Sequence, residues 1–134
     1  MAGKPPAEQG GPLSLCIAGE DDLADTLGRL KGKLVKGRKL HTQTFKGTQV
    51  PGNCHMLYVA ASEQKRYRGL VRTVRGQAIL TVSELPGFAR TGGIVELTHA
   101  HGRIRFIINL GLARAAGLEI SPRLLALAEV VDQE

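Results

Sequence analysis

The sequence is poor in aromatic residues and has no long hydrophobic run. It contains no tryptophan, three phenylalanines and two tyrosines among 134 residues, so leucine, isoleucine, valine and alanine must fill the core. No apolar stretch reaches the ~18 residues that a membrane-spanning helix needs. A chain of this length is expected to form one domain around one core.

Recognisable catalytic motifs are also missing. Neither Ser62 nor Ser83 lies in a Gly-x-Ser-x-Gly elbow, and no Walker-type phosphate loop occurs. His99 and His101 have a spacing that can bind zinc from one strand face, but the sequence places no third ligand beside them. These features favour a binding protein over an enzyme, and they predict neither a metal nor a cofactor.

Negative charge is in deficit, and the formal net charge is +6. Such a balance allows attraction to nucleic acid, anionic lipid or an acidic partner. Five cations fall in one predicted helix: Lys65, Arg66, Arg68, Arg72 and Arg75. Because no set of stacking aromatic residues accompanies them, we favour an exposed charged face and expect no nucleic-acid partner.

The first half of the chain alternates strand and helix patterns. Residues 13–18 alternate in polarity as a short strand does, between Pro12 and Gly19. Leucines at helical spacing predict a helix that Asp21 or Asp22 caps and that continues through Leu34 to Gly37. Residues 39–45 predict a second strand. The apolar run 54–60 is short enough to be a central strand covered on both faces.

The second half repeats this alternation. Ser62 is a plausible N-cap for a helix whose apolar face comprises Tyr67, Leu70, Val71 and Val74. A strand at 78–82, an antiparallel hairpin at 94–98 and 103–108, and a helix at 110–116 follow. Ser121 and Pro122 predict the start of a last helix that continues to Val131. The fold class is therefore α/β: a single domain with a mixed sheet, parallel central strands, a late antiparallel hairpin and helices on both faces.

Several segments, taken in order, resemble the YfiR family. They read LSLCIAG (13–19), GKLVKGR (32–38), NCHMLYVA (53–60), AILTVSELPGFARTGG (78–93), GRIRFIIN (102–109) and AGLEISPRLLALA (116–128). The resemblance covers roughly residues 12–132. Two positions depart from the family pattern: Ile107 replaces an acidic residue in the late strand, and Pro122 replaces a serine.

The resemblance implies a periplasmic regulatory protein. Members of the family bind the sensor domain of an inner-membrane diguanylate cyclase and hold the enzyme inactive, which lowers cyclic-di-GMP and biofilm formation. An OmpA-like outer-membrane lipoprotein can draw the repressor away, and the family forms homodimers. An alternative is a small-ligand binding module for a nucleotide or a peptidoglycan fragment.

Residues 1–11 are rich in glycine and proline and predict a flexible polar tail before a domain at 12–134. Family members normally begin with a signal peptide and a further helix with a Trp-Pro ending. Neither is in this sequence, which we interpret as trimmed at its start. The periplasmic location is thus inferred from the family.

Cys16 and Cys54 are the two cysteines, and each falls in a predicted central strand. The residues alone leave two interpretations open: a disulfide, or two buried thiols that act as small hydrophobic side chains. The periplasmic setting of the family favours the disulfide, because that compartment is oxidising.

Three predicted strands end at one edge of the sheet, at Gly19, at Ser62–Glu63 and at Ser83–Glu84. In open α/β sheets ligands bind beyond the carboxyl ends of the strands, where helix N-termini favour anions. Ser62, Ser83 and Glu84 are therefore candidate ligand-binding residues, although we favour the interpretation that the two serines only cap helices.

Phe88 is a large aromatic residue in a Pro/Gly turn. It either folds inward under the loop or anchors a partner. Our hypothesis is that residues 83–93 form a recognition loop, in which Phe88 packs against a partner or a second protomer with Arg90 beside it.

Overall fold

The computed structural model describes residues 11–131, which form one α/β domain built on a single eight-stranded sheet. Residues 1–10 of the predicted tail (1–11) and residues 132–134 lie outside the described residues. The strands are β1 (Leu13–Ala18), β2 (Leu34–Val35), β3 (Arg38–Phe45), β4 (Met56–Val59), β5 (Leu80–Ser83), β6 (Val95–Ala100), β7 (Arg103–Asn109) and β8 (Ala128–Val131). The helices are α1 (Asp22–Gly28), α2 (Tyr67–Val74), α3 (Leu110–Ala115) and α4 (Pro122–Ala126), with 3₁₀ turns η2 (Ala61–Glu63) and η3 (Phe88–Arg90).

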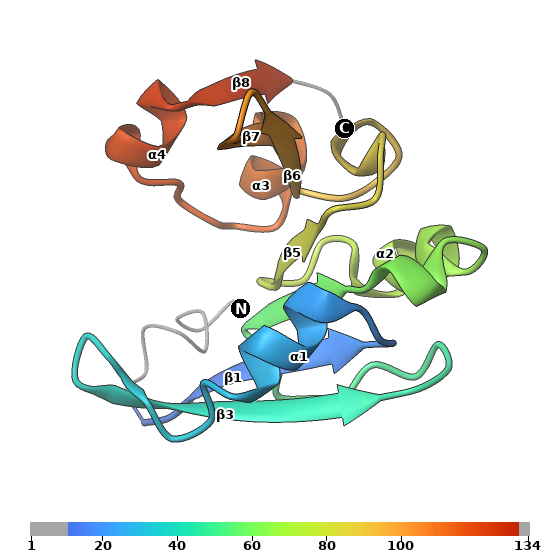
Figure 1. Cartoon of the computed structure of the whole chain (residues 1–134), viewed down its shortest axis with the longest axis vertical. Helices are drawn as coiled ribbons and strands as arrows, with labels where there is room; N and C mark the ends of the chain where they lie inside the picture. The colour runs from blue at the N-terminus through green and yellow to red at the C-terminus, as the bar shows by residue number, and fades with distance from the viewer. Residues whose placement is uncertain (1–10, 132–134) are drawn as a thin grey trace.

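The sheet is mixed, in the order β2-β3-β1-β4-β5-β6-β7-β8. The five strands from β3 to β6 in this order run parallel. The β6–β7 hairpin is antiparallel, as the sequence predicts, and β8 pairs with β7 in parallel. Figure 1 shows these strands from β3 at the bottom to β8 at the top. The predicted fold class is confirmed.

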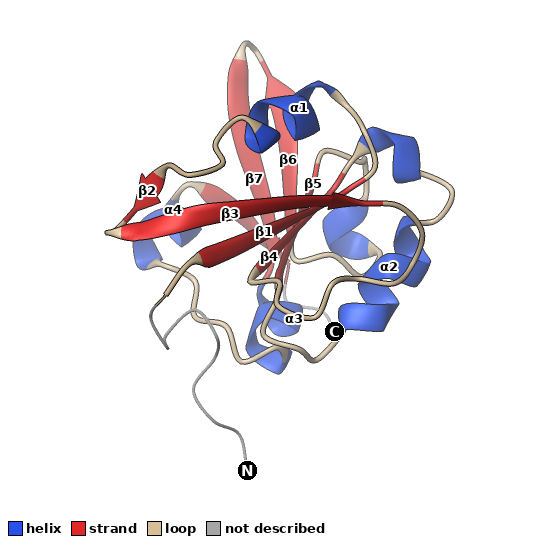
Figure 2. Ribbon diagram, turned by 90° about the horizontal axis from the view of Figure 1, so that it is seen from below, coloured by secondary structure: helices blue, strands red, loops and turns tan. Residues whose placement is uncertain are grey.

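Helices cover both faces of the sheet. The apolar side chains of β1 alternate between the two faces, so each face needs a helix packed against it. Leu15 and Ile17 pack in one cluster with Ala24 of α1. Cys16 and Ala18 point to the opposite face and pack in a cluster with Leu70 of α2. Figure 2 shows α1 on one side of the strands and α2 and α3 on the other. A third cluster, under α3 and α4, joins Ile94 and Ile108 to Leu112 and Ala113.

The predicted helix through Leu34 is wrong beyond Gly28. The chain leaves the helix there, and Leu34 lies in β2, antiparallel to Lys39 of β3. The leucine spacing is misleading because only its first part reaches the core: Leu23 and Leu27 pack against it, whereas Leu34 is 69% exposed.

The end of the chain needs a second correction. Ser121 caps α4 by accepting the Arg123 N–H at 3.1 Å, as predicted. The helix stops at Ala126, however, and the last described residues form strand β8 rather than a continued helix. Pairing with β7 decides the outcome, because the free edge of β7 offers backbone partners that a local helical pattern cannot reveal. Within residues 11–131 no helix is long and apolar enough to cross a membrane.

Candidate functional site: the carboxyl edge and the arginine cleft

Two places bring candidate functional side chains together. The first, called the carboxyl edge here, comprises Asp21, Ser62, Glu63, Ser83 and Glu84, which follow or end strands β1, β4 and β5. The second, called the arginine cleft, is bounded by Arg68, Arg72, Arg75 and Arg90. The sequence predicts the first place, and only Arg90 of the second is among the predicted site residues.

Asp21 organises the carboxyl edge. Its Oδ1 accepts the Ala24 N–H at 2.7 Å and so caps α1, as predicted. Its Oδ2 accepts two further hydrogen bonds at 2.8 Å, from the Tyr58 hydroxyl and from the Ala61 N–H. One carboxylate thus joins the start of α1 to the end of β4.

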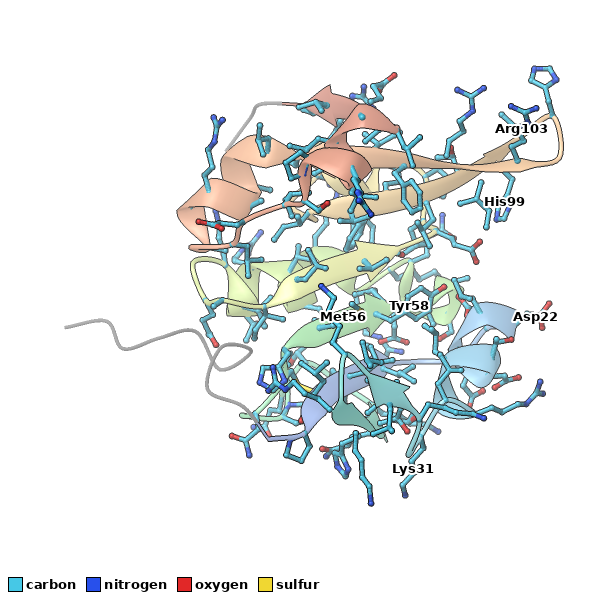
Figure 3. The ribbon with its side chains drawn as sticks, turned by 90° about the vertical axis from the view of Figure 1, so that its left-hand side faces the viewer. Asp22, Lys31, Met56, Tyr58, His99 and Arg103 are labelled. Atoms are coloured by element: carbon cyan, nitrogen blue, oxygen red, sulfur yellow. A yellow bond between two sulfur atoms is a disulfide. The ribbon has the colours of Figure 1, made fainter. Side chains whose placement is uncertain are left out.

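The Tyr58 hydroxyl is held as a donor in this network. Its side chain is 1% exposed, and it points toward α1 in Figure 3. Burial, together with the hydrogen bond to Asp21 and the nearby Glu84 carboxylate, raises the pKa of Tyr58 well above its ordinary value. The phenol therefore stays protonated and serves the network as a structural donor.

Ser62 and Glu63 close the edge beneath Gly19. The Ser62 hydroxyl accepts the Glu20 N–H at 2.8 Å and donates to Glu63 Oε2 at 3.2 Å, and Arg66 pairs with the same oxygen at 3.0 Å. Glu63 is 3% exposed, and its other oxygen has no hydrogen-bond partner within residues 11–131. Gly19 has a φ of +83°, and a Cβ there would meet both side chains.

The prediction that Ser62 caps the following helix is wrong. Ser62 lies within the turn η2, and α2 begins five residues later, at Tyr67, without a side-chain cap. Ser83 is fully buried: its hydroxyl donates to the Val59 carbonyl at 2.6 Å and accepts the Leu85 N–H at 3.0 Å. Both serines hold the chain in place at the edge.

Glu84 lies at the exposed end of this edge. Its Oε2 lies 2.7 Å from Nε2 of His99, which reaches it from the projecting β6–β7 hairpin. Figure 3 shows His99 near the end of that hairpin, with Arg103 beyond it. His99 is thus engaged by a carboxylate, and within residues 11–131 no group of three His, Cys, Asp or Glu side chains could hold a metal.

Residues 83–93 are tied to the core rather than free. The buried Glu96 carboxylate accepts the N–H groups of Gly87 and Ala89 at 3.1 and 3.0 Å. Phe88 is fully buried, its ring 5.8 Å from that of Tyr67, and a Cβ on Gly93 would overlap it. Of the two alternatives for Phe88, the structure therefore shows the one in which the ring folds inward under the loop. A ring without exposed surface cannot make contact with a partner.

Arg90, unlike Phe88, is exposed. It pairs with Glu129 of β8 at 2.7 Å, and both side chains are at least half exposed. It also borders a cleft of about 380 Å³ between α2 and α3. The lining residues are Arg68, Val71, Arg72, Arg75, Arg90, Thr91, Gly92, Asn109 and Leu112.

Asn109 fixes the wall of the arginine cleft. Its Nδ2 donates to the Ala89 carbonyl at 2.8 Å, and its Oδ1 caps α3 by accepting the Leu112 N–H at 3.0 Å. One buried amide thus ties the turn η3 to the start of α3. Sequence reasoning missed this residue, although Asn immediately before a helical pattern is a recognised capping signal.

The cysteines are joined by a disulfide, with a Cα–Cα separation of 5.8 Å. The prediction that both lie in strands is wrong for Cys54, which precedes β4 by two residues. The bridge lies in the core cluster beneath α2 and closes a loop with a sequence separation of 38. A loop of this length corresponds to roughly 4 kcal/mol by the chain-entropy estimate.

The family comparison adds one finding. The model of a protein family described as YfiR/HmsC-like matches residues 3–129, nearly the whole chain.

Proposed function

The chain belongs to the YfiR/HmsC-like family, and from this membership we propose that it is a periplasmic regulator that binds and represses the sensor domain of an inner-membrane diguanylate cyclase. The match over residues 3–129 is the observation that carries the proposal. The Cys16–Cys54 disulfide supports the location, because disulfides persist in oxidising compartments. In this proposal an OmpA-like outer-membrane lipoprotein competes for the regulator, which acts as a homodimer.

Repression of this kind is a shift in population. A protein that binds the inactive state of the cyclase more tightly than the active state moves the enzyme toward inactivity. Such a regulator needs a binding surface and no catalytic group. At the carboxyl edge the serines and carboxylates hold the chain together, so the proposal places partner binding elsewhere on the surface.

The small-ligand alternative gains no support from the carboxyl edge. An anionic nucleotide or peptidoglycan fragment would need N–H donors and positive charge there. Instead the edge carries three carboxylates, from Asp21, Glu63 and Glu84, and the Ala24 and Ala61 N–H groups already donate to Asp21.

Deleting the gene should raise cyclic-di-GMP in the host, and an exported copy should lower it again. The matched control is the same chain without an export signal, which could not reach a periplasmic sensor domain. The measurement is cyclic-di-GMP in cell extracts, beside pull-down of the purified sensor domain by the oxidised protein. Unchanged cyclic-di-GMP in a host that encodes a neighbouring cyclase, together with no pull-down, would rule the proposal out.

A further inference from the structure

The arginine cleft concentrates positive charge without matching negative charge. Arg68, Arg72 and Arg75 are exposed along α2, and Arg90 faces them from η3, whereas Val71 and Leu112 are buried beneath. The lining contains no acidic residue. Within residues 11–131 Arg68, Arg72 and Arg75 make no ion pair, so three of these four charges lack an acidic partner in the described chain. The Arg68 guanidinium does lie 6.0 Å from the centroid of the Tyr67 ring.

Helix electrostatics do not account for this arrangement. Arg72 and Arg75, at the C-terminal end of α2, interact favourably with the negative end of the helix dipole. Arg68 lies in the first turn, where positive charge is unfavourable, and it stands four residues before Arg72, where like charges repel. These effects favour Arg72 and Arg75 and disfavour Arg68, so helix stability does not account for the whole row.

Arg90 shows which kind of group the arginines of the cleft can bind. Its guanidinium binds the Glu129 carboxylate at 2.7 Å in an exposed pair. Exposed pairs of this kind contribute little to stability, so a carboxylate from another molecule can replace Glu129 without much loss. Guanidinium groups also match carboxylates in planar, two-pronged contacts, which makes arginine a preferred residue at protein interfaces.

We propose that the arginine cleft binds an acidic segment of the protein partner, with carboxylates that engage Arg68, Arg72, Arg75 and Arg90 over an apolar floor. The inference rests on the proposed function in taking the partner to be a protein. Arg68 and Arg75 are seven residues apart, about 10 Å along a helix. An extended acidic chain, at about 3.3 Å per residue, spans that row with carboxylates on alternate residues.

A small anion fits the cleft less well than an acidic segment. Small-ligand sites bury most of the ligand and converge a few polar groups on it. Here the arginines are exposed on the rim, and the buried polar residue, Asn109, already uses both side-chain atoms on the Ala89 carbonyl and the Leu112 N–H. The charges are thus spread along a groove rather than gathered on one point.

The test compares Arg72→Glu/Arg75→Glu with Arg103→Glu/Arg105→Glu in the oxidised full chain. Arg103 and Arg105 are exposed on β7, so the control pair makes the same change in net charge away from the cleft. The probe is a short fluorescein-labelled poly-glutamate peptide, measured by anisotropy. We expect the cleft pair to weaken binding by roughly tenfold or more and the control pair by less than about threefold. Equal losses for the two pairs would mean attraction by net charge only and would overturn the inference.

Two further ligands test whether the cleft binds a small anion or a nucleic acid instead of an acidic peptide. Inorganic phosphate should displace the peptide only through ionic strength, as sodium chloride does. A single-stranded oligonucleotide should bind the cleft pair as well as it binds the control pair, because the two variants have the same net charge. Displacement by phosphate at far lower ionic strength would show a small-anion site. Oligonucleotide binding that depends on the cleft arginines would show a nucleic-acid site. Each result overturns the inference.

If the wild type binds the peptide but not the cyclase sensor domain, the inference stands and the proposed function fails. If the cleft pair retains full binding to the sensor domain, the inference fails and the function stands.

Discussion

The carboxyl edge and the arginine cleft differ in whether the chain supplies partners for its own charges. At the edge, Asp21 receives three hydrogen bonds and Glu63 pairs with Arg66. In the cleft, among residues 11–131, the ion pair between Arg90 and Glu129 is the one that involves a cleft arginine, and it is exposed. Charge that is satisfied internally stabilises a fold, whereas charge left unmatched at a surface is available for binding. Substitutions should therefore affect stability at the edge and association at the cleft.

Phe88→Ala should produce the largest loss of stability, about 3–5 kcal/mol, because it removes a fully buried ring from the core under the turn that carries Arg90. Urea denaturation of the oxidised protein measures this loss. Phe88→Leu retains most of the buried apolar volume and should lose clearly less. A change in the free energy of unfolding below ~1 kcal/mol, together with weakened association, would instead support the hypothesis that Phe88 anchors a partner.

Asp21→Ala should cost about 3 kcal/mol, because it removes the cap of α1 and leaves the buried Tyr58 hydroxyl without its acceptor. Asp22→Ala is the matched control: this neighbouring carboxylate is exposed in the first turn of α1 and should cost only a few tenths of a kcal/mol. Thermal melts of the two variants measure the difference. Equal melting temperatures would mean that the Asp21 network contributes nothing beyond a surface charge.

The sequence was informative where local pattern and burial agree. Alternation in residues 13–18 and the apolar face of α2 both predict elements that the structure contains, because these side chains face a core. It failed for β2 and β8, which are strands of two and four residues whose state depends on a neighbouring strand. Leu34 shows the difficulty, because it follows the helical spacing of leucines but its side chain is exposed.

Prediction of the candidate site was limited by contacts between distant residues. Asp21 was visible only as a cap, because its bonds to Tyr58 and Ala61 join positions 37 and 40 residues apart. The row of arginines on α2 could be predicted from the sequence. The cleft could not be predicted, since Asn109 and Leu112 of its opposite wall come from the end of β7 and from α3, far from α2 in the sequence.

Arg72→Gln should have the smallest effect on stability, within about 0.5 kcal/mol of zero. It relieves repulsion from Arg68 and Arg75, worth ~0.2–0.5 kcal/mol for each pair, and it forfeits a similar favourable interaction with the end of the α2 dipole. Urea denaturation at low salt, with Arg103→Gln as the control, measures this balance. The same substitution should still weaken binding of the acidic peptide. A loss above ~1 kcal/mol with peptide binding intact would make Arg72 a structural residue, and the contrast between edge and cleft would no longer hold at that position.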